Sequence, residues 1–355
     1  MVFTIPLQLA DYSPRGSRLF SSEMSTALVS ARVMPERDPI LALMPLPHRA
    51  EFYPYGFAAS VVSNSPMVLE AARESWAEMP KRFEAPPLDL RCVVTEGAGA
   101  DCPPPPVARA QRNLIVSVAD AENYWCGDLA TGIGSAWVTE RVAANTHYLR
   151  YHVLEAMAYS LLGSLHVVTL HAACVALHGC GVLLAGDSGA GKSSLAYACA
   201  RRGWTYISDD SSSLLRRSAA RTVLGDPRLF RFRATAGSLF PEFQGMEESR
   251  HAHGKPTIEV RASSLPAIRT ALESRVDAVV FLNRRHGREG QAELIPVAGD
   301  DAMRRLSYSP WPADLPTEGE RTTVLKRLAE TRACEMRYRD LDAAADKLER
   351  IVRGD

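Results

Sequence analysis

The first part of the chain carries short apolar runs of two kinds, some with the two-residue period of strands and one with helical spacing. Apolar residues alternate from 88 to 94, and β-branched residues gather at 58–63 and 114–118, so we predict a strand at each place. Residues 67–79 instead show helical spacing, with an apolar face formed by Val68, Leu69, Ala72 and Trp76. This mixture predicts an α+β unit.

A loop and a second helix complete this part of the chain. Residues 97–106 combine glycines with consecutive prolines, which excludes regular structure and predicts a surface loop. Asn145 then offers an N-cap to a helix. Its apolar face repeats every four residues, at Leu149, Val153, Met157 and Leu161.

The stretch 156–186 contains no Asp, Glu, Lys or Arg and is long enough to span a bilayer. Histidines and glycines interrupt it, however, and divide it into the end of the preceding helix near Gly163 and two β-branched or apolar segments, 165–170 and 181–185. Buried strands explain these segments better than lipid does, so we expect no transmembrane segment. We place a domain boundary near residue 165, which gives domains 1–165 and 166–355.

The second half alternates strands and helices. A strand at 181–185, a glycine-rich turn, a helix from about 191 to 202 closed by Gly203, and a strand at 204–208 form a β-α-β unit. This unit predicts a parallel sheet with a right-handed crossover. The later elements that we predict are a buried strand at 278–282, a helix at 321–331, a strand at 334–338 and a final helix capped by Asp340.

Composition narrows the class of protein. Of 355 residues, 46% are hydrophobic and 23% are charged, which is typical of globular chains and excludes a disordered or fibrous protein. Lys+Arg and Asp+Glu both number 41, so the formal charge is zero and no basic field would attract nucleic acid. Seven cysteines without a Cys-x-x-Cys pair, and residues 1–6 without a basic secretory n-region, favour a reducing cytosol and a cytoplasmic location. Only five cations are lysines, so each lysine merits attention.

One motif strongly indicates a phosphate-binding loop. Gly186-Asp-Ser-Gly-Ala-Gly-Lys192-Ser193 fits the phosphate-binding pattern G-x-x-x-x-G-K-[ST], and it follows an apolar strand and opens a helix, as that pattern requires. Glycines let backbone N–H groups converge on phosphate oxygens, and the helix adds its positive end. Lys192 would then reach the β- and γ-phosphates, and the Ser193 hydroxyl would bind Mg²⁺.

Such a loop needs a carboxylate, and two follow the next strand as Asp209-Asp210. Adjacent side chains at a strand end point in different directions, so one could hold Mg²⁺ while the other accepts a proton from an attacking hydroxyl. An ordinary turn explains Asp-Asp-Ser equally well in isolation, but its place after the phosphate-binding helix favours function. His171, fifteen residues before Gly186, would by itself be a hydrogen-bonded core histidine.

Together these residues resemble a known family. His171-Ala-Ala, then His178-Gly-Cys-Gly with the Gly-Asp-Ser-Gly-x-Gly-Lys-Ser loop, then Arg202-Gly-Trp-Thr-Tyr-Ile-Ser-Asp209-Asp210, is similar in order and spacing to the core of HPr kinase/phosphorylase. The resemblance covers 170–213 firmly. It implies a P-loop kinase domain of HPr-kinase/phosphoenolpyruvate-carboxykinase-like type, preceded here by a smaller α+β N-terminal domain.

The resemblance also implies an activity and a site. The activity is transfer of the γ-phosphoryl group of ATP, with Mg²⁺, to a serine hydroxyl of a peptide or small protein. Asp209 would act as base with His171 close to it, Lys192 would complete the catalytic set, and Ser193 and Asp210 would hold the metal. Hexamers in the resembled family imply a possible homo-oligomer. The nucleotide would contact Gly186, Asp187, Ser188, Gly189, Ala190, Gly191, Lys192, Ser193 and Ser194.

The sequence departs from the bifunctional bacterial enzymes downstream. They carry Glu-Ile-Arg-Gly-Leu-Gly, whereas the comparable region here begins Leu224-Gly-Asp-Pro-Arg. This difference argues against HPr as the substrate and against phosphorylase activity. HPr-kinase-like proteins with such variations include relatives of the kinases that phosphorylate lasso-peptide precursors.

Other polar groups carry weaker signals. Arg228, Arg231 and Arg233 could meet transferring phosphate, although charges alternating along an exposed strand explain them slightly better. Lys255 lies in a polar segment that reads as an ordinary surface loop, and His251-Ala-His253 makes a weak metal site.

Two other functions remain open at this point. A kinase of a small metabolite would use the same core. A non-catalytic nucleotide-binding module, in which the first half recruits a partner, would need neither Asp209 nor His171.

Overall fold

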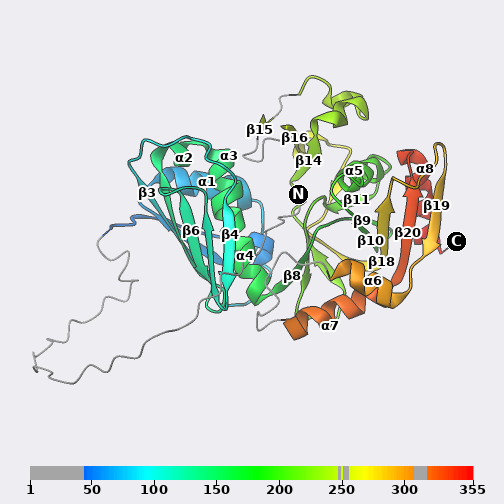
Figure 1. Cartoon of the computed structure of the whole chain (residues 1–355), viewed down its shortest axis with the longest axis horizontal. Coiled ribbons are helices and arrows are strands. Elements are labelled where there is room, and N and C mark those ends of the chain that lie inside the picture. The colour runs from blue at the N-terminus through cyan, green and yellow to red at the C-terminus, as the bar shows by residue number, and fades with distance from the viewer. Residues whose placement is uncertain (1–43, 247–248, 251–255, 308–317, 355) are drawn as a thin grey trace, which may run out of the picture.

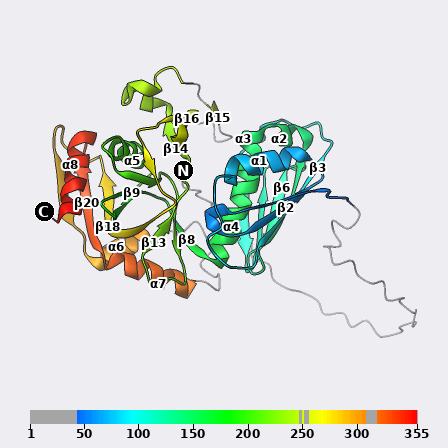
Figure 2. The same ribbon diagram turned by 180° about the vertical axis from the view of Figure 1, so that it is seen from behind.

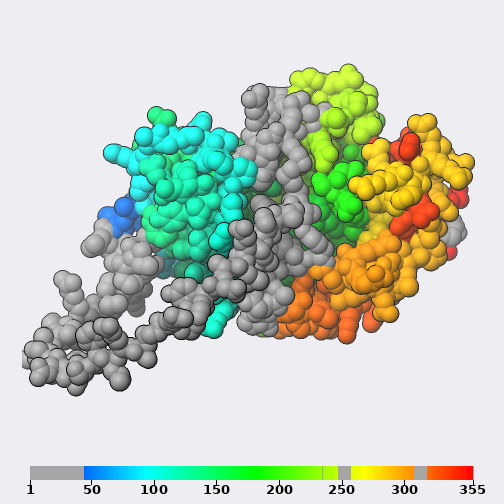
Figure 3. All heavy atoms as spheres, viewed as in Figure 1, coloured from blue at the N-terminus to red at the C-terminus, as the bar shows by residue number. Residues whose placement is uncertain are grey.

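The computed structural model describes residues 44–246, 249–250, 256–307 and 318–354. They form two bodies that lie side by side, one in blue to green and the other in green to red (Figures 1 and 3). The expectations for residues 1–6, for Lys255 and for His251 and His253 fall outside the described residues.

A mixed seven-stranded sheet forms the first body, in the order β1-β2-β3-β7-β6-β5-β4. The pairs β2–β3 and β3–β7 are parallel and the other neighbours are antiparallel. Helices α1 and α4 pack on this sheet over a core that includes Trp76, Leu90 and Met157. The strands are β1 His48–Phe52, β2 Ala59–Ser63, β3 Leu88–Thr95, β4 Val107–Gln111, β5 Leu114–Val118, β6 Tyr124–Asp128 and β7 Ile133–Thr139. The helices are η1 Pro54–Gly56, α1 Pro66–Trp76, α2 Glu140–Ala144, α3 Thr146–Tyr148, η2 Leu149–Glu155 and α4 Ala156–Leu165.

The predicted long helix at the end of this body is present, with one change of geometry. The Asn145 side chain accepts a hydrogen bond from the Tyr148 N–H, as expected of an N-cap. The four apolar residues spaced along it are all buried. Its middle, η2, is a π-helical stretch, a rare geometry that is frequent at functional sites, and it buries the polar residues Arg150, His152 and Glu155.

A ten-stranded sheet forms the second body (Figure 2). Its order is β17-β11-β9-β10-β18-β13-β12-β8, and β20 pairs with β18 and β19. The strands are β8 Val167–Leu170, β9 Ala172–Leu177, β10 Cys180–Ala185, β11 Thr205–Ser208, β12 Ser212–Leu215, β13 Thr222–Leu224, β17 Arg269–Thr270, β18 Glu273–Asn283, β19 Ala292–Pro296 and β20 Arg332–Tyr338. The helices are α5 Lys192–Arg201, α6 Gly299–Leu306, α7 Glu318–Ala329 and α8 Leu341–Arg353.

The predicted parallel arrangement is wrong in one respect. Strands β10 and β11 run in the same direction and α5 joins them, but both pair antiparallel with β9, which lies between them. The sheet is therefore mixed, and the β10–α5–β11 crossover skips one strand. The cause is a tight hairpin: Leu177 pairs with Cys180, and His178 and Gly179 at the turn both have positive φ, which folds β9 back beside β10.

Helices cover both faces of this sheet. Along β10, Val182 and Leu184 join one core with α5 and α8, while Leu183 and Ala185 join the other with α6 and α7. The alternation follows the two-residue period of a strand that is buried on both sides.

A small antiparallel sheet sits over α5, in the order β14-β16-β15. An aromatic cluster anchors it, because the ring of Tyr197 on α5 contacts Phe230 and Phe232 of β14 and also Phe240 and Phe243. This packing fixes the direction in which β14 runs past the start of α5. The elements are β14 Leu229–Arg233, η3 Ala234–Ser238, η4 Pro241–Phe243, β15 Ser249–Arg250, β16 Pro256–Arg261 and η5 Ala262–Ser264.

No helix among the described residues combines the length and apolar character needed to cross a membrane. All seven cysteines lie in the described residues as free thiols.

Candidate functional site

The glycine-rich loop connects β10 to α5 and has the backbone that its sequence requires. Gly189 and Gly191 have φ of 89° and 94°, values that favour glycine. A Cβ at position 191 would also lie 2.4 Å from the hydroxyl oxygen of Tyr338. That hydroxyl donates a 2.7 Å hydrogen bond to the Ala190 carbonyl, which ties the loop to the end of β20.

Several backbone N–H groups of this loop remain available to a ligand. Within the described residues, those of Ser188, Gly189 and Gly191 donate no hydrogen bond to the protein. Asp187, Ser188 and Gly189 are exposed, Gly186, Gly191, Ser193 and Ser194 are half-buried, and Ala190 is buried. The loop therefore presents unpaired donors beside the start of a helix, which is the chemistry that a polyphosphate requires.

Lys192 lies inside this loop with only 6% of its surface exposed. Its Nζ donates to the carbonyl oxygens of Gly186 and Asp187, at 2.8 and 3.3 Å. Burial lowers the pKa of Lys192, and the charges of Asp210 and Asp187 oppose that effect. The ammonium group is thus held at the loop by main-chain acceptors.

Asp209 follows β11 and is 5% exposed. Its Oδ2 accepts a 2.6 Å hydrogen bond from the backbone N–H of Arg231 on β14. Burial, followed by the charge of Asp210, raises the pKa of Asp209 to about 7, and Arg231 opposes the rise only in part. A carboxyl with a pKa in this range can accept a proton near neutral pH.

Asp210 has the opposite character. Its side chain is 48% exposed, and its Oδ1 lies 3.2 Å from Nδ1 of His171. Burial alone would raise the pKa of Asp210, but the hydrogen bond and charge of His171 hold the pKa well below its usual range. Neighbouring carboxyl groups with pKa values driven apart are typical of an acid–base site.

His171 occupies the turn between β8 and β9. Its Nδ1 lies 3.1 Å from the backbone oxygen of Asp210, so the ring contacts both the main chain and the side chain of that residue. The contact of His171 is thus with Asp210 and not directly with Asp209.

The sheet register brings these groups to one edge. Ala172 pairs with Ala185, so His171 lies beside the strand end from which Gly186 begins the loop. Ser208, which precedes Asp209, pairs with Cys174 on the other side of β9. The histidine, the loop and both aspartates therefore meet at the same end of three adjacent strands.

Different partners contact the three arginines that the sequence singles out, Arg228, Arg231 and Arg233. Arg228 forms an ion pair with Asp226, and Arg231 forms ion pairs with Glu155 and Glu259. Arg233 instead reaches the loop: its Nη2 donates to Ser188 Oγ at 2.9 Å, and its guanidinium lies near Gly189. The alternation of arginines and apolar residues in the sequence does not distinguish Arg233 from the other two arginines. Their different contacts arise because β14 packs over α5.

The residues present fit ATP and Mg²⁺. A glycine-rich loop with unpaired N–H groups and a buried lysine suits the phosphates. Ser193 and the ionised Asp210 offer oxygen ligands. This suits Mg²⁺ held by one or two protein oxygens together with substrate phosphates.

Comparison with known protein families finds a match to one part of the chain. Residues 165–231 match the family model described as the HPr Serine kinase C-terminal domain. The solved structure of the Hpr(Ser) kinase/phosphatase from Coxiella burnetii is 12% identical, with a TM-score of 0.26 over 53% of this chain and 99% of that one. No curated protein sequence matches the chain. The matched segment, residues 165–231, carries His171, the glycine-rich loop and both aspartates, and in this segment the chain is similar to the HPr-kinase family.

Proposed function

We propose that this protein is a kinase that transfers the γ-phosphoryl group of ATP to a serine hydroxyl of a peptide or small protein, with Mg²⁺. The observation that carries the proposal is the meeting of a phosphate-binding loop with a buried carboxyl of pKa about 7 at one edge of the sheet. The serine acceptor rests on the description of the matching family as a serine kinase.

Asp209 is the proposed base. In its ionised form it accepts the proton of the serine hydroxyl while the serine oxygen forms a bond to the γ-phosphorus and the bond to the β-phosphate oxygen breaks. ADP then leaves, and the proton remains on Asp209 until solvent removes it. The raised pKa makes this carboxyl basic enough to take a proton near neutral pH.

Lys192 and Arg233 are the proposed phosphate ligands among the side chains. The Lys192 ammonium would exchange its present carbonyl partners, Gly186 and Asp187, for phosphate oxygens. Arg233 already contacts Ser188 on the outer side of the loop, so a small movement would bring its fork to the transferring group. Positioning and charge neutralisation of this kind account for most of the catalysis of phosphoryl transfer.

Ser193 and Asp210 are the proposed ligands of Mg²⁺, which would neutralise the charge on the phosphates. His171 acts on Asp210 by keeping that carboxyl ionised and oriented, through contacts at 3.1 and 3.2 Å. His171 is therefore a positioning residue in this proposal.

A transfer assay tests the proposal. The purified chain is incubated with Mg²⁺ and γ-labelled ATP, in parallel with a peptide library containing serine, the same library with alanine at each serine, and a mixture of hydroxylated metabolites. Label transferred to serine peptides alone is expected. Label on metabolites alone would make the protein a metabolite kinase, and ATP binding without transfer to either would make it a nucleotide-binding module.

A variant of Asp209 tests its proposed role as the base. Asp209→Asn should bind ATP with little change but transfer phosphate at least about a hundredfold more slowly, because general bases contribute roughly 10²–10⁴ to a rate. Asp226→Asn is the matched control, since Asp226 is a nearby carboxylate whose partner is Arg228. Wild-type rates in Asp209→Asn would remove Asp209 from the reaction.

A further inference from the structure

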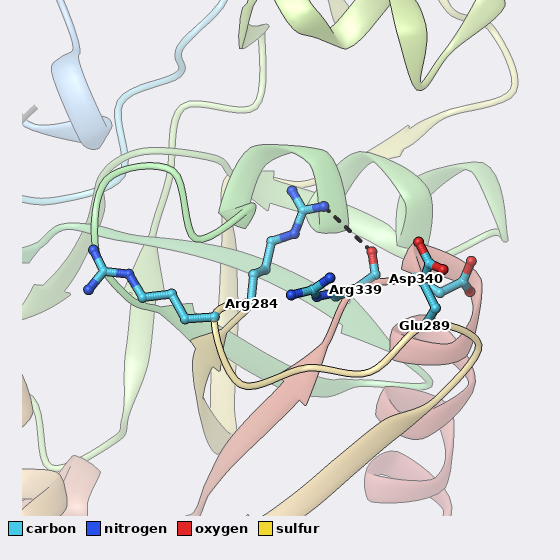
Figure 4. Close-up of a pocket in the computed structure, with 5 residues that line it drawn as sticks. Arg284, Glu289, Arg339 and Asp340 are labelled. Carbon is cyan, nitrogen blue, oxygen red and sulfur yellow. Dashed lines mark hydrogen bonds between the residues drawn. The ribbon is translucent and has the colours of Figure 1, made fainter.

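A pocket of about 530 Å³ lies on the side of the glycine-rich loop away from the two aspartates. It is formed by the segment after β18 and by the junction between β20 and α8. Figure 4 shows Arg284 beside Arg339, with Glu289 and Asp340 together on the far side of Arg339. The lining residues are Arg284, Arg285, Glu289, Arg339 and Asp340.

The backbone around this pocket is fixed against the loop. The Tyr338 hydroxyl binds the Ala190 carbonyl, and the Arg284 guanidinium lies 5.9 Å from the centre of the Tyr338 ring. A Cβ at position 191 would lie 3.3 Å from Cδ of Arg284, so the Arg284 side chain borders the loop directly. Gly287 packs so closely on the Tyr338 backbone that a Cβ there would lie 2.2 Å from its carbonyl carbon, which holds the segment after β18 in place.

The strand order places this pocket on the opposite side of β10 from His171 and Asp209. Strand β10, which leads into the loop, has β9 and β11 with His171 and Asp209 on one side. On its other side lie β18 and β20, which end in the pocket. A nucleotide whose γ-phosphate points to Asp209 must extend its other end away from that residue, toward β18 and β20.

The chemistry of the pocket suits a planar and hydroxylated group. The lining arginines supply flat surfaces and donors, while the carboxylates of Glu289 and Asp340 offset most of the positive charge and can accept bonds from hydroxyls. Within the described residues, Glu289 is exposed and has no ion-pair partner, so its carboxylate is available to a ligand.

We propose that this pocket binds the base and ribose of the nucleotide, with arginine planes against the base and a carboxylate on the ribose hydroxyls. The inference rests on the proposed function, because it assumes that the loop holds the triphosphate. If the pocket binds the nucleoside, the protein binds ATP more tightly than it binds a triphosphate chain without a nucleoside.

The test compares binding of ATP with binding of inorganic tripolyphosphate, both with Mg²⁺, by calorimetry. Arg339→Ala and Glu289→Ala are the variants, because both side chains are exposed and neither supports the loop. Arg288→Ala is the matched control, since this exposed arginine lies in the same segment but does not line the pocket. We expect the Kd of ATP to rise about tenfold in Arg339→Ala, a loss of about 1.4 kcal/mol. The Kd of tripolyphosphate should stay within about twofold in every variant, and the control should match the wild type.

Three results would overturn the inference. Equal affinity of the wild type for ATP and tripolyphosphate would leave the phosphate loop intact but remove any nucleoside site. An equal loss of both ligands in Arg339→Ala would make the pocket a phosphate site, and no change in either pocket variant would make it unrelated to the nucleotide. Failure of the wild type to bind either ligand is a different result, because it overturns the proposed function itself and this inference with it.

Discussion

Replacing Asp209 with asparagine should make the folded protein more stable at neutral and alkaline pH. Asp209 keeps its proton in the folded state up to about pH 7, whereas its ordinary pKa is 3.8. Between these values the folded state binds more protons than the unfolded state does, so the free energy of unfolding falls as the pH rises, and the full penalty is present above about 7. Each pKa unit corresponds to about 1.4 kcal/mol, so the penalty is roughly 4 kcal/mol.

The variant removes this penalty while keeping the contact, because the asparagine oxygen can still accept the Arg231 N–H. Urea unfolding of the wild type and Asp209→Asn at pH 5 to 8.5 measures the difference. The variant should gain stability progressively over the wild type as the pH rises. Asp226→Asn should instead lose stability, since its carboxylate is paired with Arg228. Parallel curves for the wild type and Asp209→Asn, or destabilisation of both variants, would refute the reasoning.

Three other predictions concern activity. The kcat/KM of the wild type should rise with pH along an acid limb near 7, because Asp209 must be ionised to accept a proton; a flat profile from pH 5.5 to 8 would contradict this. Lys192→Ala should weaken ATP binding by about ten- to a hundredfold in calorimetry, the value of a charge-assisted contact, while Lys326→Ala on the exposed face of α7 should not change it. Arg233→Ala should lower kcat about tenfold or more with a smaller change in the Kd of ATP, measured by single-turnover transfer, if its guanidinium acts on the transferring group.

Local patterns in the sequence predicted most of the long elements. The apolar residues at four-residue steps after Asn145 are buried along the helix that this residue caps. Asp340 accepts the Ala343 N–H at 2.8 Å and begins the last helix as its sequence position indicates. In both cases the signal lies within a few residues of the structure that it determines.

The missed elements have weak local signals. Residues 172–177, which form β9, contain three alanines, and alanine has a low preference for strands, so the sequence does not predict a strand there. The turn His178-Gly179 is the signal that could have revealed the hairpin, because both residues adopt the positive φ of a tight two-residue turn. Once β9 is recognised, the mixed sheet follows from its pairing with β10 and β11.

The candidate site shows the same limit. Spacing alone predicts the loop, and the structure shows positive φ at its glycines and N–H groups without acceptors in the protein. The contact of Arg233 with Ser188 joins residues that are 45 positions apart, and it depends on how the aromatic cluster seats β14 over α5. The pocket at Arg284 and Arg339 likewise combines the ends of two strands far apart in the chain. No local sequence pattern predicts contacts between residues that are this far apart in the chain.

The first body of the protein also takes part in setting the chemistry of Asp209. Glu155, 5% exposed at the end of the π-helical stretch, accepts a hydrogen bond from Ser75 and lies 3.7 Å from Arg231. Arg231 is also 3.0 Å from Glu259, so two carboxylates share its charge. A guanidinium neutralised in this way is a weak counterion for Asp209, although its backbone N–H holds that carboxyl at 2.6 Å. This arrangement explains how a buried aspartate can lie beside an arginine and still have a pKa near 7, because the first body supplies one of the two charges that occupy the arginine.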